Sequence, residues 1–132
     1  MKNIQELYEE CLKELNSINI DLKKIAEIDI SLSKRNNKRY GCCKPEEPDK
    51  LTKHIVKVRG HRYVKYERYN KYHIEVSPWV MELDENIIKN TIMHEIIHCF
   101  PNCNNHGQEF KKYARFINSK LGYNIERLGN KE

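Results

Sequence analysis

The stretch that decides the fold is His94-Glu95-Ile96-Ile97-His98, which is followed by His106-Gly107. Residues four apart on a helix share a face, with Cβ atoms roughly 5–6 Å apart, so His94 and His98 can hold one metal ion between them. Glu95 lies three residues before His98 and points toward the same ion from the edge of that face. This placement suits a base acting on water better than a metal ligand.

The residues around this run predict a buried helix. Asp84 stands where it can cap the start of the helix, and Pro101 follows soon enough after His98 to stop it. Apolar side chains recur between these ends at Ile87, Ile88, Met93, Ile96 and Ile97. The alternative is a core helix whose histidines are satisfied by hydrogen bonds alone, but the combination of spacing and context favours a metal site.

A third ligand must come from outside this helix, because a hydrolytic zinc has three protein ligands and a fourth position open to water. We expect His106, since seven residues separate it from His98 and allow the chain to turn back alongside the site. Cys103 is the main alternative, because thiolate is a good zinc ligand. The other candidates are Glu109, Cys99, His73 and Glu126.

Two further segments read as helices. One apolar stripe runs through the first segment of the chain, and a second follows His106 at spacings of three and four residues. The first stripe consists of Ile4, Leu7, Tyr8, Cys11, Leu15 and Ile18, and the second of Phe110, Tyr113, Ala114, Ile117 and Leu121. His106 therefore stands at the start of a packed helix.

The segments between these helices predict strands. Alternating apolar residues mark strands at 28–32 and 72–77, residues 39–44 are expected to pair beside 28–32, and 45–49 is expected to be a loop. Residues 54–59 and 62–69 suggest a hairpin around Gly60-His61. We therefore expect an α+β fold, in which a small, mostly antiparallel sheet packs against an N-terminal helix and the H-E-x-x-H helix, followed by a second C-terminal helix.

Length and composition predict one domain that spans residues 1–132. The sequence is 39% hydrophobic and 33% charged, it has no run close to the roughly 18 apolar residues of a membrane span, and its start lacks the apolar core of a signal peptide. The five cysteines have no framework spacing and suit a compartment where they stay thiols. These features predict a cytoplasmic protein without a membrane partner.

Charge is distributed unevenly, and residues 34–72 hold thirteen basic and four acidic side chains. Cations can neutralise phosphates and tyrosine rings can stack on unpaired bases, so the hairpin is a candidate contact for single-stranded DNA. The candidate residues are Lys57, Arg59, Arg62, Lys65, Arg68, Tyr66 and Tyr69. The alternative is structural, because tyrosine favours strands and Lys or Arg protects exposed edges from aggregation.

Several of these segments together resemble the SprT-like zinc metallopeptidases, the group that includes Spartan. The resemblance is strongest from Asn90 to Arg127, including Asn105-His106-Gly107 and Leu121-Gly122-Tyr123-Asn124-Ile125, and the upstream segments 38–43 and 72–77 are also similar. It implies one zinc ion held by His94, His98 and His106, with Glu95 as the catalytic acid and base. The chain contains no C-x-x-C pair, so we expect no zinc ribbon after the peptidase region.

The resemblance implies a zinc-dependent metalloendopeptidase that cleaves DNA-associated proteins, as in the repair of DNA–protein crosslinks. Its partners would be a protein or peptide substrate and single-stranded DNA. Two alternatives stay open: a zinc-stabilised nucleic-acid-binding protein without protease activity, and a general intracellular peptidase. A fourth, thiolate ligand from Cys103 would favour the structural role, and an open fourth position would favour the enzyme.

Overall fold

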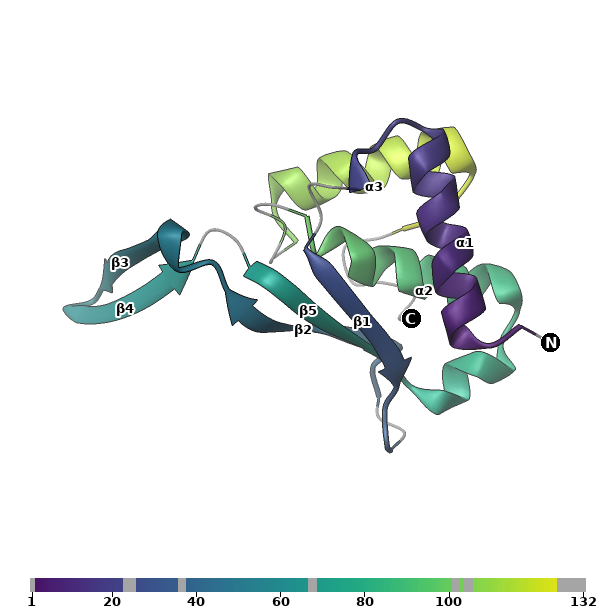
Figure 1. Ribbon diagram of the computed structural model, residues 1–132, viewed down its shortest axis with the longest axis horizontal. Helices are drawn as coiled ribbons and strands as arrows, with labels where there is room; N and C mark the ends of the chain where they lie inside the picture. Colours follow the sequence, from purple (N-terminus) through teal and green to yellow (C-terminus); the bar gives the residue numbers. More distant parts are fainter. Residues whose placement is uncertain are drawn as a thin grey trace.

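The computed structural model describes residues 2–22, 26–35, 38–66, 69–100, 103 and 106–125 (Figure 1). The elements are α1 (Ile4–Ser17), β1 (Glu27–Leu32), β2 (Gly41–Pro48), η2 (Lys50–Thr52), β3 (Lys53–Val58), β4 (His61–Tyr66), β5 (Tyr69–Val76), η3 (Pro78–Glu82), α2 (Glu85–Ile97) and α3 (Gln108–Leu121). This combination of helices with small sheets confirms the predicted α+β class. No helix within the described ranges is long and apolar enough to cross a lipid bilayer.

The main sheet has the strand order β1-β5-β2. Strand β5 pairs in parallel with β1 and antiparallel with β2, so Ile74 lies between Ile30 and Cys43. The expectation that 39–44 pairs beside 28–32 is therefore wrong, because β5 separates the two segments. The backbone of β5 is paired on both edges, and on one face of the strand the side chains of Tyr72, Ile74 and Val76 are at most 3% exposed.

The expected loop at 45–49 is also wrong, because β2 continues through Pro48. Its pairing with β5 becomes irregular around Glu47. Prolines are tolerated here because β2 is an edge strand, and an edge strand does not need every backbone N–H for the ladder.

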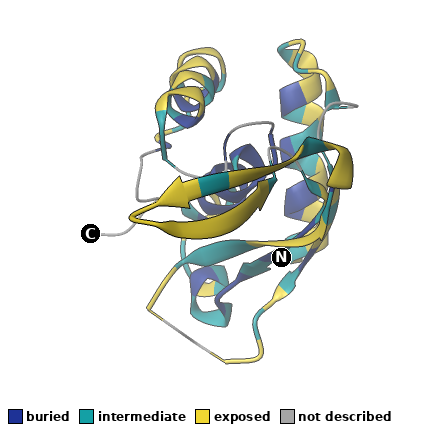
Figure 2. Cartoon of the chain, turned by 90° about the vertical axis from the view of Figure 1, so that its left-hand side faces the viewer, coloured by how far each residue is buried: buried dark blue, intermediate teal, exposed yellow. Residues whose placement is uncertain are grey.

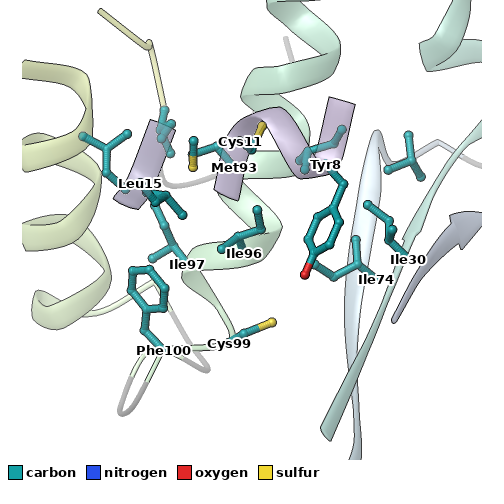
Figure 3. Packing of buried hydrophobic residues seen from close by; sticks show 14 of the residues in the cluster. Tyr8, Cys11, Leu15, Ile30, Ile74, Met93, Ile96, Ile97, Cys99 and Phe100 are labelled. Carbon is teal, nitrogen blue, oxygen red and sulfur yellow. The ribbon is translucent and has the colours of Figure 1, made fainter. Parts of the chain in front are cut away.

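Helix α2 forms the centre of the core. Every residue from Asn90 to Ile97 is buried, and α1 covers it with its predicted stripe, of which Leu7, Tyr8, Cys11 and Leu15 are buried. Figure 3 shows Tyr8 reaching from α1 to Ile30 and Ile74 on the strands. The buried residues therefore gather where α1, α2 and the sheet meet.

The ends of α2 only partly follow the sequence expectation. Asp84 occupies the N-cap position, but its side chain makes no capping hydrogen bond. Its carbonyl oxygen instead accepts from the N–H groups of Ile87 (2.9 Å) and Ile88 (3.1 Å). Pro101, the expected stop, lies outside the described residues.

Two asparagines hold the segment after α3 against the core. Asn90 donates to the carbonyl of Asn124 and accepts from its N–H, both at 2.9 Å. Asn118 makes the same pair of bonds to Ile125, at 3.0 and 2.8 Å. These bonds tie residues 124 and 125 to α2 and α3, and the side chain of Ile125 is buried.

The predicted hairpin is present as β3 and β4, which extend away from the helices (Figure 1). Its turn is Arg59-Gly60, one residue earlier than expected, and both residues have positive φ (52° and 81°). This is the signature of a type I′ turn, whose twist matches that of the two strands. Nearly all of the hairpin is exposed, as the yellow ribbon in Figure 2 shows.

Candidate metal centre

The three histidines singled out by the sequence lie together. His94 is in the last turn of α2, His98 caps that helix, and His106 lies two residues before α3. One ring nitrogen from each residue lies within 4.8 Å of the other two. Among the residues that the structure describes, these three form the group that could hold a metal ion.

The distance between two of the histidines matches that expected around a tetrahedral zinc. Nε2 of His94 lies 3.3 Å from Nε2 of His106. A tetrahedral ion with Zn–N bonds of about 2.0–2.1 Å places its ligand nitrogens about 3.3–3.4 Å apart. Nδ1 of His98 donates to the carbonyl oxygen of Cys103 at 2.9 Å, which fixes the tautomer and leaves Nε2 with a lone pair for a metal.

Phe110 supports all three imidazoles. Its ring centroid lies 5.0, 4.8 and 5.0 Å from those of His94, His98 and His106, and the residue is only 1% exposed. Burial in this apolar surrounding lowers the pKa of His98 to about 4. His98 is therefore neutral at physiological pH, which is the form that binds metals.

Glu95, the next residue after His94, is buried beside the group. Burial raises the pKa of its carboxyl group to about 8, and the positive charge of Arg39 acts in the opposite direction. Arg39 lies just before β2, and its carbonyl oxygen accepts a hydrogen bond from Ser77 Oγ (2.6 Å). Sequence reasoning did not assign Arg39 a role, because only the fold brings residue 39 near residue 95.

Strand β2 approaches Glu95 at Gly41. A Cβ atom at this position would lie 3.0 Å from the carbonyl oxygen of Glu75, 3.3 Å from Cγ2 of Thr91 and 3.5 Å from Cγ of Glu95. A side chain would thus push the strand away from α2. A glycine inside a strand pattern often marks such a close approach, and this was the available sequence signal.

The alternative third ligands lie elsewhere. Cys103 contributes its backbone carbonyl rather than its thiol, and burial raises the pKa of that thiol to about 12. Cys99 faces Cys43, and His73 lies on the other face of the sheet between Asp29 (3.2 Å) and Glu75 (3.4 Å). Glu109 is exposed on the first turn of α3, and Glu126 lies outside the described residues.

The candidate DNA-contacting residues do not all lie on one face of the hairpin. Lys57 and Arg62 lie directly opposite each other near the turn, which contains Arg59, whereas Lys65 lies on the other face opposite His54. Tyr66 packs against Tyr69 at the base of the hairpin, with ring centroids 6.0 Å apart. Arg68 lies outside the described residues.

Comparison with protein families gives a match to the family described as SprT-like, over residues 8–128. The matched range covers most of the chain and contains the three histidines and Glu95. Comparison with curated proteins gives no match.

Proposed function

The chain belongs to the SprT-like family, and on this premise we propose that it is a zinc-dependent metalloendopeptidase. The observation that carries the proposal is the convergence of His94, His98 and His106, together with the buried side chain of Glu95 next to His94 on the same helix. Such a combination provides both a metal site and a proton acceptor. These are the two components that metal-assisted peptide hydrolysis needs.

His94, His98 and His106 are the residues that would hold the zinc ion. When bound, zinc supplies Lewis-acid chemistry, which polarises a carbonyl group and lowers the pKa of water toward about 7. The backbone carbonyl of Cys103 accepts a hydrogen bond from His98, and the Cys103 thiol is not part of the group of possible metal ligands. This arrangement supports an open catalytic site rather than a closed structural one.

Glu95 is the proposed general base and acid. Its pKa near 8 without metal places proton gain and loss close to neutral pH, where a catalytic carboxyl group is most effective. Glu95 accepts a proton from the attacking water and later passes it to the leaving amine. The approach of Gly41 and the packing of α2 keep this side chain away from bulk solvent.

No strand in the part of the chain that the structure describes pairs with the outer edge of β2, and this edge is suited to a peptide substrate. In the antiparallel pairing with β5, the Ser77 N–H bonds to the Tyr40 carbonyl, so alternate residues Cys42 and Lys44 continue the ladder. Gly41 and Cys43 therefore turn their backbone groups away from β5, beside Glu95. An extended peptide can pair with these groups by strand addition.

The decisive experiment combines metal analysis with proteolysis of the full chain. We expect one zinc per chain, cleavage of a casein-like substrate, and loss of cleavage with retained zinc in Glu95→Gln. Glu9→Gln, an exposed change of the same kind on α1, is the matched control and should keep full activity. Unimpaired proteolysis by Glu95→Gln would refute the assignment of the base.

We also propose that the substrates are DNA-associated proteins and that the hairpin contacts single-stranded DNA. Lys57 and Arg62 face each other across β3 and β4, although like charges directly opposite are destabilising. A phosphate bound between them would remove this repulsion. The apolar pair Ile55 and Val64 lies next along the same face and is more than half exposed, so it offers bases a contact surface.

DNA binding is tested by its dependence on salt. The double variant Lys57→Glu/Arg62→Glu should weaken binding of single-stranded DNA and reduce the slope of log K against log salt by about 0.7, the value for the one phosphate contact that the pair would hold. Lys65→Glu, on the other face of the same hairpin, is the control. Equal losses in both variants would contradict the proposed face, and cleavage of casein unaffected by DNA would favour a general peptidase.

A further inference from the structure

Two cysteines that are distant in sequence meet between β2 and the end of α2. Sγ of Cys43 on β2 lies 3.6 Å from Sγ of Cys99, which follows the cap of α2. The two residues are 56 positions apart. Figure 3 shows Cys99 extending from the end of α2 toward the sheet.

The facing directions follow from strand geometry. Successive side chains of a strand point to opposite faces, and the Cβ position of Gly41 faces Thr91 and Glu95 on α2. Cys43, two residues later, faces the same way, whereas Cys42 points to the other face. Only one member of this vicinal pair therefore meets Cys99.

The two cysteine residues differ in their exposure to solvent. Cys99 is 3% exposed, while Cys43 is only partly buried. An accessible thiol beside a second, buried thiol is the arrangement in which the first sulfur is oxidised and the second resolves it. A disulfide of this kind, formed and reduced again, is also the kind found in reducing compartments.

We propose that Cys43 and Cys99 form a reversible disulfide modification site that responds to hydrogen peroxide. The Cys43 sulfur attacks peroxide, the O–O bond breaks, and a sulfenic acid and one water form. The Cys99 sulfur then attacks the sulfenic sulfur, and the S–O bond breaks with release of a second water. Both thiol hydrogens leave in water, the sulfurs are oxidised and the peroxide is reduced.

The crosslink would join β2 to the end of α2. These are the elements that carry Gly41 and His98, so oxidation would fix the strand that borders Glu95 against the helix that holds the metal ligands. Because the crosslink closes a loop of 56 residues, we expect the Tm to rise by about 10 °C. The inference concerns the thiols themselves and does not rest on the proposed peptidase function.

The test treats the full chain, in zinc-containing buffer, with a small excess of hydrogen peroxide. The intact mass before alkylation should fall by two hydrogen atoms relative to the reduced chain, the oxidised chain should take up two fewer alkyl groups when it is alkylated under denaturing conditions, and peptide mapping should find a Cys43–Cys99 link. The raised Tm should return to its starting value with dithiothreitol. The link should persist in Cys42→Ser, the matched neighbour, and disappear in Cys43→Ser and Cys99→Ala.

Several results would overturn the proposal. These are a link between Cys42 and Cys43, oxidation of Cys43 to the sulfinic acid without a crosslink, or a crosslink that forms only after unfolding in urea. Cys43 is partly exposed, so Cys43→Ser should fold even if the buried change Cys99→Ala does not.

Discussion

Replacement of Phe110 tests whether the core shapes the metal centre. The ring contacts all three imidazoles with centroid distances of 4.8–5.0 Å and is almost fully buried. Its removal therefore affects packing and ligand placement together. Phe110→Leu keeps most of the volume but loses the aromatic ring that contacts the three histidines.

The two effects have different expected sizes. Phe110→Ala should lower the free energy of unfolding by about 3–5 kcal/mol, a large part of the about 5–15 kcal/mol typical of a domain, because a cavity remains. Phe110→Leu should cost less than about 1.5 kcal/mol. Zinc affinity should nevertheless fall about 10-fold or more in Phe110→Leu, as for other groups that orient metal ligands.

The assay measures urea unfolding with a chelator present, and zinc affinity by competition with a chromophoric chelator. Phe116→Ala, on the same helix but 39% exposed, is the control and should change both quantities little. If Phe110→Leu loses stability but binds zinc like the wild type, the ring is only a core residue and the reasoning is refuted.

Three further perturbations have defined outcomes. Gly41→Ala should destabilise the chain by about 1–3 kcal/mol and lower peptidase activity, since its Cβ would lie 3.0 Å from a carbonyl oxygen; wild-type urea unfolding and activity would argue against the close approach. In the metal-free chain, the buried Glu95 keeps a proton that the unfolded chain releases above pH 4.5, so stability falls as pH rises toward 8, whereas His98 makes stability rise between pH 4 and 6.5. Above pH 6.5 only the Glu95 effect remains, so the free energy of unfolding should fall by about 2 kcal/mol between pH 6.5 and 8. Chemical unfolding should detect this fall, and Glu95→Gln should abolish it. Asn90→Ala should cost about 2–3 kcal/mol in unfolding experiments because it leaves the N–H and carbonyl of Asn124 without this partner, and a neutral effect would contradict that role.

The local patterns of the sequence predicted the helices and the convergence of the histidines well. His94 and His98 share a helical face, and the apolar spacing from Phe110 onward places His106 at the start of α3. Both inferences depend on periodicity within one helix or on a short connection between two. Such information is contained in a few neighbouring residues.

The strand order and the surroundings of the site could not be predicted in the same way. The central position of β5 results from competition among strands for the core, which depends on the whole chain. The bond from His98 to Cys103 uses a backbone carbonyl, which any residue would supply. The sequence left the thiol of Cys103 open as an alternative to His106, whereas the fold uses the main chain of Cys103.

X-ray absorption at the zinc edge of the zinc-loaded chain tests the central claim most directly. The account predicts one zinc per chain with three imidazole nitrogens and one water oxygen at about 2.0–2.1 Å. A sulfur ligand at about 2.3 Å, or fewer than three imidazoles, would contradict it.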